Sequence, residues 1–151
     1  MDPGFNIKTL GYKSLKKRIK KNEGFSLKPY KDQLGFFTIG YGHLILSNEK
    51  HLKEKKTSKA DLEKIFTNDF NKAVKDYRKM LRPFSSNIKE SELLIEMVFQ
   101  IGACGVLKFK KMLHHMEKGN KHLTSFEMMN SLWYKQTPNR VKNLITVFLK
   151  K

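Results

Sequence analysis

The stretch from Asn22 to Ile45 constrains the fold most, because it places short strand-like runs inside a chain that otherwise has helical spacing. These runs cover residues 27–31, 36–39 and 43–45. Glycines separate them as turns, namely Gly35, Gly40 and Gly42. The pattern predicts a small antiparallel sheet.

Apolar residues at helical spacing dominate the rest of the chain. We expect a short helix over residues 12–22 that ends at Gly24, and a long helix over residues 58–81 with Ser58 at its start. About 22 residues at 1.5 Å each make the long helix about 33 Å. The sequence therefore predicts an α+β fold in which a long helix joins a small lobe with a short antiparallel sheet to an all-helical lobe.

We expect one domain over residues 1–151. Its small lobe covers about 22–60, and its connecting helix covers about 58–81. Its helical lobe covers about 82–151 and also takes in the N-terminal helix at about 12–22. Other expectations are local. Residues 1–11 form a loosely held arm, 46–57 form a surface loop, Thr124 and Glu127 form a capping box, and Thr137 caps a last helix that starts at Pro138. Cys104, the single cysteine, excludes an intramolecular disulfide and is expected to be buried.

The charge is strongly one-sided, with 31 Lys and Arg against 14 Asp and Glu, which gives a net charge of +17. Such a field favours polyanions: nucleic acid, an anionic membrane surface or an acidic cell wall. Charge alone does not choose among them. No apolar run approaches the ~20 residues of a membrane span, and the first ten residues do not have a secretory signal. We therefore expect a chain that is made soluble.

Two carboxylates in the central stretch are candidates for chemistry. Glu23 falls at the C-terminal end of the first expected helix, where the helix dipole disfavours an anion by roughly 0.3–1 kcal/mol. It is either a solvated surface glutamate or a general acid that retains its proton. Asp32 is either a turn residue or an ionised carboxylate that acts as a base or electrostatic partner. Thr38 is either an ordinary strand residue or a hydroxyl that holds a nucleophilic water. One protonated and one ionised carboxylate cleave glycosidic bonds, but this spacing alone is weak evidence.

Several chemistries are disfavoured by missing motifs. The sequence has no HExxH pattern, no phosphate-binding glycine loop and no G-x-S-x-G elbow. We therefore expect no metal, no cofactor, no nucleotide chemistry and no serine nucleophile.

The stretch that starts at Asn22 reads N-E-G-x3-K-x-Y-K-D-x2-G-x2-T-I-G-x-G-H-L. This pattern resembles the catalytic segment of the phage-type lysozymes, the T4 lysozyme family of endolysins. Two further blocks resemble the family in the same order: M-V-F-Q-I-G at 97–102 and W-Y-K-Q-T-P-N-R at 133–140. The resemblance covers most of the chain, although the segment between Ile45 and Thr57 is shorter than in the family.

The resemblance implies a muramidase that hydrolyses the β-1,4 bond between N-acetylmuramic acid and N-acetylglucosamine, with inversion. It implies that Glu23 is the general acid, that Asp32 acts on the water from the opposite face, and that Thr38 positions this water. The implied substrate-binding residues are Leu44, Phe99, Gln100 and Arg140. His43 and Asp69 match a structural ion pair of the family.

The implied biology is that of an endolysin that lyses its bacterial host. We expect a monomer that is made in the host cytoplasm and acts on peptidoglycan in the periplasm. The anionic envelope or membrane surface is expected to attract it as well. Nucleic acid is not expected as a partner. Two alternatives stay open: a cationic membrane- or polyanion-binding antibacterial domain that has lost catalysis, and a lytic transglycosylase. The basic helix over residues 138–151 is either a core helix or a membrane-surface helix.

Overall fold

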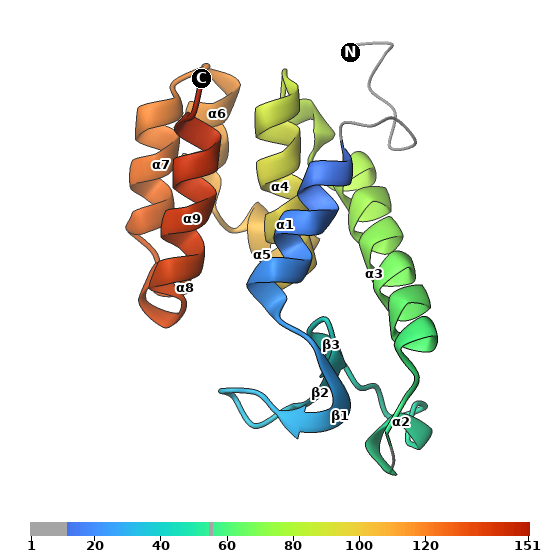
Figure 1. The fold of residues 1–151 in the computed structure, drawn as a ribbon. Coiled ribbons are helices and arrows are strands. Elements are labelled where there is room, and N and C mark those ends of the chain that lie inside the picture. The colour runs from blue at the N-terminus through green and yellow to red at the C-terminus, as the bar shows by residue number, and fades with distance from the viewer. Residues whose placement is uncertain (1–11, 55) are drawn as a thin grey trace. The chain divides into compact units, whose positions relative to one another are not determined.

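The computed structural model describes residues 12–54 and 56–151 and divides into two compact units. The first, the sheet unit, is Lys13–Lys72. The second, the helical unit, comprises Tyr12 and Ala73–Lys151. Figure 1 labels the elements of both units, which are described separately below.

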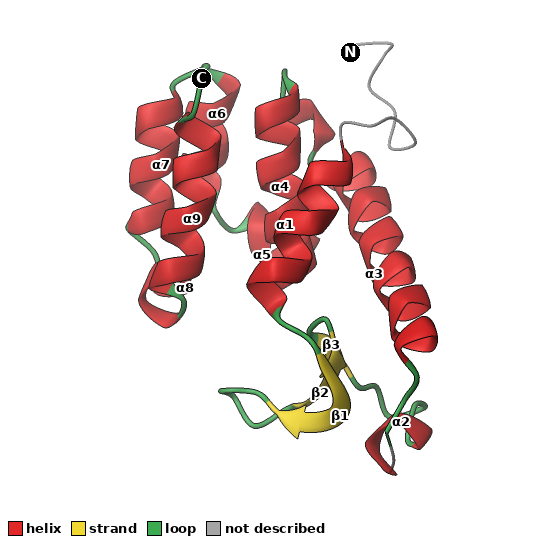
Figure 2. Cartoon of the chain, in the orientation of Figure 1, coloured by secondary structure: helices red, strands yellow, loops and turns green. Residues whose placement is uncertain are grey.

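The sheet unit holds all three strands in the part of the chain that the structure describes (Figure 2). Its elements are α1 (Lys13–Glu23), β1 (Ser26–Lys31), β2 (Phe37–Gly40), β3 (His43–Leu44), α2 (His51–Glu54) and the first part of α3 (Lys59–Met80). The strands pair antiparallel in the order β1-β2-β3. The predicted sheet is confirmed, with strand boundaries within one residue of the expected ones.

The register of the sheet decides which side chains share a face. Tyr30 of β1 pairs with Thr38 of β2, and Thr38 pairs with Leu44 of β3. Side chains of directly paired residues project to the same face, so these three form one row across the sheet. Next to Thr38, Ile39 projects to the other face and packs with the buried residues Ile45, Leu52 and Leu62.

The helical unit begins with the end of α3 and a short 3₁₀ turn. Its elements are η2 (Arg82–Phe84), α4 (Ile88–Ile101), α5 (Ala103–Leu107), α6 (Lys110–Glu117), α7 (Lys121–Met129), α8 (Leu132–Gln136) and α9 (Pro138–Leu149). Helix α7 contacts α6, α8 and α9, and α9 also contacts α4. The buried Tyr12 hydroxyl lies 2.9 Å from that of Ser91 on α4.

The long helix is confirmed: α3 has 22 residues, and the Ser58 hydroxyl accepts a hydrogen bond from the Asp61 N–H at 3.2 Å. Its residues belong to the sheet unit up to Lys72 and to the helical unit from Ala73. The α+β fold class is therefore confirmed. The expected first helix, here α1, falls in the sheet unit, and one domain over the whole chain stays a prediction.

Three local expectations were wrong, and a fourth was correct in position only. The segment 46–57 contains α2, whose Leu52 is buried in the core, so it is not only a surface loop. Helix α7 begins after Asn120, whose side chain accepts from Leu123 N–H, and Thr124 lies inside it. Thr137 is the N-cap residue of α9 and Pro138 its first residue, as expected, but the Thr137 hydroxyl donates to the Trp133 carbonyl at 3.1 Å and makes no capping hydrogen bond. Cys104 is exposed, because residues 103–107 form the short helix α5 and this side chain lies on its outer face.

Helix α9 packs as a core helix. Its apolar residues Val141, Leu144 and Phe148 are buried. A membrane-surface role would need this face to be accessible, so the alternative of a membrane-lying helix is not supported. Among the described residues, none of the helices combines the length and the apolarity of a membrane span. The expected arm at 1–11 lies outside the described residues.

Candidate active site

Glu23 is the last residue of α1, where the sequence placed it. The chain leaves the helix at Gly24, which has a φ of 74° and donates its N–H to the Lys20 carbonyl at 3.1 Å. A left-handed residue here turns the backbone directly into β1. The partly buried Glu23 side chain is therefore held at the junction between helix and sheet.

Gly42, in the turn between β2 and β3, lies against the Glu23 carboxyl group. A Cβ atom at this position would overlap Oε2 of Glu23 and lie 3.0 Å from its Cδ. Gly42 also has a φ of 74°, which side chains rarely adopt. The backbone conformation thus favours glycine beside the candidate acid, and a side chain here would fit only if the Glu23 carboxyl group moved.

Asp32 fastens the turn between β1 and β2. Its Oδ1 accepts hydrogen bonds from the N–H groups of Leu34 and Phe36, both at 2.9 Å. This is the turn role that the sequence allowed. Within residues 12–54 and 56–151, Oδ2 has no hydrogen-bond partner, so this exposed oxygen is available to a water or substrate. The turn role and a catalytic role are therefore compatible.

Thr38 lies at the centre of the row across the sheet and is 5% exposed. Its hydroxyl donates to the Phe36 carbonyl at 3.1 Å, and its lone pairs are left to accept a hydrogen bond. Leu44, expected in substrate binding, lies next to Thr38 on the same face and is 48% exposed. The structure therefore brings these two predicted residues together.

Tyr30, on the other side of Thr38, was missed from the sequence. Burial raises the pKa of its phenol above the ordinary value of 10, and the negative charges of Glu23 and Asp32 raise this pKa further. The phenol therefore lies within electrostatic reach of both candidate catalytic carboxylates. The row of Tyr30, Thr38 and Leu44 and the two carboxylates form what we call the sheet-face site.

His43 braces the sheet unit. Its Nδ1 lies 2.7 Å from Oδ2 of Asp69, which confirms the predicted ion pair, and its Nε2 lies 2.9 Å from Oε1 of Glu49, which was not predicted. The hydrogen bond to Asp69 raises the pKa of His43 to about 9, opposed by burial and assisted by Glu49. Since this pKa lies above the unfolded value near 6.5, the stabilisation is complete below pH 6.5 and is lost as the pH rises through 9.

The other predicted substrate-binding residues lie in the helical unit, on α4 and α9. Phe99 and Gln100 are partly buried near the end of α4, and the Gln100 amide donates to the Thr137 hydroxyl at 3.4 Å. Nε of Arg140 lies 3.4 Å from Oε2 of the fully buried Glu96. This buried ion pair joins α9 to α4 and fixes the Arg140 side chain within its unit.

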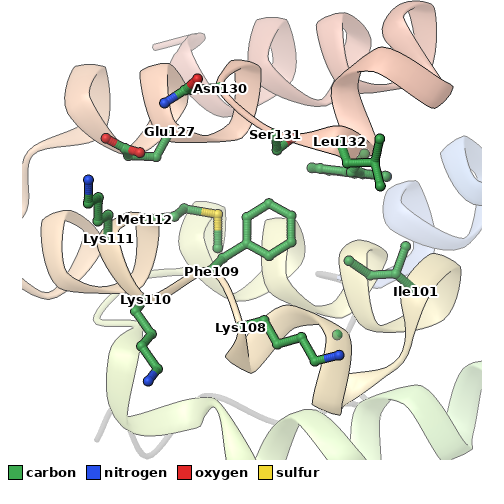
Figure 3. A pocket seen from close by; sticks show the side chains of 12 residues that line it. Ile101, Lys108, Phe109, Lys110, Lys111, Met112, Glu127, Asn130, Ser131 and Leu132 are labelled. Atoms are coloured by element: carbon green, nitrogen blue, oxygen red, sulfur yellow. The ribbon is translucent and has the colours of Figure 1, made fainter.

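A separate cavity of about 570 Å³ lies within the helical unit (Figure 3). Phe109 projects into it, and its ring packs edge-to-face on Trp133 with the centroids 5.8 Å apart. Lys108, Lys111 and Glu127 are among the residues that line it. The lining contains neither of the candidate catalytic carboxylates, so the cavity is not a candidate for the chemistry.

Some of the missed residues were accessible from the sequence. Tyr30 pairs with Thr38 once the strands are joined by the turn at Asp32, so hairpin register could have placed it. The sequence marked Gly42 only as a turn residue. Its contact with Glu23 is a tertiary contact, which the sequence does not show. Glu49, in a polar loop, carried no signal that it would reach His43.

Chemically, two carboxylates in one unit with a strand hydroxyl can serve the acid–base cleavage of a glycosidic bond. Comparison with known proteins agrees. The family model for phage lysozyme matches residues 20–146. Two proteins of Dictyostelium discoideum, probable T4-type lysozyme 2 and probable T4-type lysozyme 1, are each 34% identical over 89% of this chain and over 93% and 92% of their own lengths.

The pre-baseplate central spike protein Gp5 of Enterobacteria phage T4 is 27% identical over 90% of this chain, which corresponds to 28% of that protein. The chain therefore belongs to the phage lysozyme family, a family of glycoside hydrolases. This result confirms the family resemblance drawn from the residues of the central stretch.

Proposed function

We propose that the chain is a muramidase that hydrolyses the β-1,4 bond between N-acetylmuramic acid and N-acetylglucosamine in bacterial peptidoglycan, with inversion. One observation carries the proposal: in this member of the phage lysozyme family, the sheet unit holds Glu23 at the end of α1 against Gly42, and Asp32 in the turn between β1 and β2. Thr38 lies in the central strand of the same sheet. Two carboxylates near one point on a sheet face can flank a single glycosidic bond.

In the proposed reaction, Glu23 donates its proton to the glycosidic oxygen as the bond to the anomeric carbon breaks. Asp32 accepts a proton from a water through its available oxygen Oδ2, while the Thr38 hydroxyl accepts a hydrogen bond from the hydrogen that stays on this water. The water adds to the face of the sugar opposite the leaving group, which inverts the anomeric carbon. Water thus supplies the new hydroxyl at the anomeric carbon. Asp32 then releases its proton to solvent, and Glu23 takes one up from solvent.

Leu44 supplies an exposed apolar contact for the sugar beside Thr38. We propose substrate-binding roles for Phe99, Gln100 and Arg140 as well, on the strength of the family motif that they match.

The test of catalysis is Glu23→Gln, which keeps the side-chain shape but removes the transferable proton. We expect the rate of peptidoglycan hydrolysis to fall at least 100-fold in this variant. Its thermal unfolding should stay unchanged. Glu54→Gln is the matched control, because Glu54 is an exposed acid of the same unit outside the site. A Glu23→Gln variant that clears purified peptidoglycan as fast as wild type would contradict the assignment.

Product analysis separates hydrolysis from its alternatives. Mass spectrometry of the muropeptides should show reducing ends, whereas anhydro-muramic ends would indicate a lytic transglycosylase. Proton NMR of the first product should show the α-anomer. If Glu23→Gln protein killed bacteria as well as wild type did, the cationic antibacterial domain would be favoured instead.

We further propose that the chain acts as a monomeric endolysin, made in the host cytoplasm and acting on the cell wall in the periplasm to lyse the host. Its net charge of +17 would draw it to the anionic envelope. Association with envelope fragments should then weaken as salt is raised from 0.01 to 0.15 M, since the screening length falls from about 30 to about 8 Å. Binding that does not depend on salt would contradict the electrostatic part of the proposal.

A further inference from the structure

Tyr30 is the one residue of the sheet-face site to which neither the sequence motif nor the proposed reaction gives a role. It lies in β1, directly opposite Thr38 in the register. Tyr30 is 39% exposed, so a ligand can reach its side chain. A ring in this position is accessible from the face of the sheet on which the reaction is proposed.

The hydroxyl of Tyr30 is available for an interaction. Within residues 12–54 and 56–151, it makes no hydrogen bond with the protein. The charges of Glu23 and Asp32 disfavour its ionisation, so near neutral pH the phenol keeps its proton and is a donor. A partly buried donor without a protein partner gains from a ligand oxygen.

The position of the reacting sugar follows from the two carboxylates. A glycosidic bond that is cleaved by an acid and a base must lie between them. Tyr30 lies within electrostatic reach of both groups and next to Thr38, which is proposed to hold the water. Because Tyr30 is paired with Thr38 and projects to the same face of the sheet, a sugar whose attacking water is held by Thr38 would lie beside the exposed ring of Tyr30.

We propose that Tyr30 is a sugar-binding residue at the cleavage point, whose ring packs against the apolar face of the sugar and whose hydroxyl donates a hydrogen bond to a sugar oxygen. This inference rests on the proposed function and specifies its substrate contacts. Tyr30 is not a proton donor in the reaction, because its pKa is raised and the proton is retained. Its contribution is to hold and orient the sugar between Glu23 and Asp32.

The test measures binding without turnover. In a Glu23→Gln background, the dissociation constant for a soluble oligomer of alternating N-acetylglucosamine and N-acetylmuramic acid is compared with and without changes at Tyr30. We expect Tyr30→Ala to weaken binding about tenfold or more, through loss of the aromatic contact. Tyr30→Phe should weaken it about three- to tenfold, through loss of one hydrogen bond.

The matched control is Phe126→Ala, which removes an exposed aromatic ring in the helical unit and should leave binding unchanged. Thermal unfolding reports on the fold of each variant, and Tyr30→Phe keeps the test valid if Tyr30→Ala does not fold. If wild type cleaves peptidoglycan while both Tyr30 variants bind like their parent, this inference is overturned and the proposed function stands. If wild type neither cleaves peptidoglycan nor binds the oligomer, both are overturned.

Discussion

Replacing Gly42 by alanine should separate catalysis from stability at this site. The new methyl group would overlap Oε2 of Glu23 and lie 3.0 Å from Cδ, where ordinary contacts are longer. The obstacle is the far end of a flexible side chain, so the Glu23 carboxyl group can move aside by on the order of 1 Å at little energetic cost. A misplacement of that size can lower a catalytic rate about 100-fold.

The backbone contributes a separate effect, which a second glycine isolates. Gly42 has a φ of 74° and Gly119, at the end of α6, has a φ of 72°. A Cβ at Gly119 would meet nothing within 4 Å. Both alanine variants should therefore lose about 1–2 kcal/mol from the left-handed backbone alone.

The assay compares the initial rate of peptidoglycan clearing with the free energy of unfolding in urea. We expect both variants to lose similar stability and only Gly42→Ala to lose activity, by about 100-fold. If Gly42→Ala clears peptidoglycan at the rate of Gly119→Ala, the position of the Glu23 carboxyl group does not limit the rate. The reasoning from the contact between Gly42 and Glu23 would then be refuted.

Two further predictions concern ion pairs. The rise in the pKa of His43 from 6.5 to about 9 corresponds to roughly 3 kcal/mol, or about 2 kcal/mol after allowance for the partly exposed Asp69 and Glu49. The unfolding free energy of wild type should therefore fall by about 2 kcal/mol between pH 6 and pH 9.5. Urea titrations of His43→Asn should not show this decline. Arg140→Gln should destabilise the chain by about 3–5 kcal/mol because the buried carboxylate of Glu96 loses its cation. Adding Glu96→Gln should restore part of the urea midpoint, and equal midpoints in the single and double variants would contradict this account.

The sequence predicted best where one local signal was enough. The three strands, the 22-residue helix α3 and the end of α1 at Gly24 follow from glycine positions and apolar periodicity. Local signals gave wrong predictions where a polar side chain could form either of two hydrogen bonds. Thr124 is followed by Glu127 as in a capping box, but Asn120 caps the helix four residues earlier and the Thr124 hydroxyl bonds back to the Asn120 carbonyl at 2.7 Å.

The candidate site shows the same limit. Glu23, Asp32 and Thr38 could be named from their motif, and their catalytic roles stay predictions. The environment of each depends on contacts between segments that are distant in the sequence. Glu96 illustrates this: a glutamate in an apolar helix gives no indication of its partner, and only the packing of α9 on α4 brings Arg140 to it.

The placement of Trp133 has a practical consequence for spectroscopy. It is the only tryptophan of the chain, and it is buried in the helical unit. Its fluorescence will therefore follow the melting of that unit, while the imidazole resonances of His43 report on the sheet unit. The exposed thiol of Cys104, on α5 of the helical unit, adds a single attachment point for a dye. Without any engineered label, the loss of structure in the two units can be followed separately in one sample.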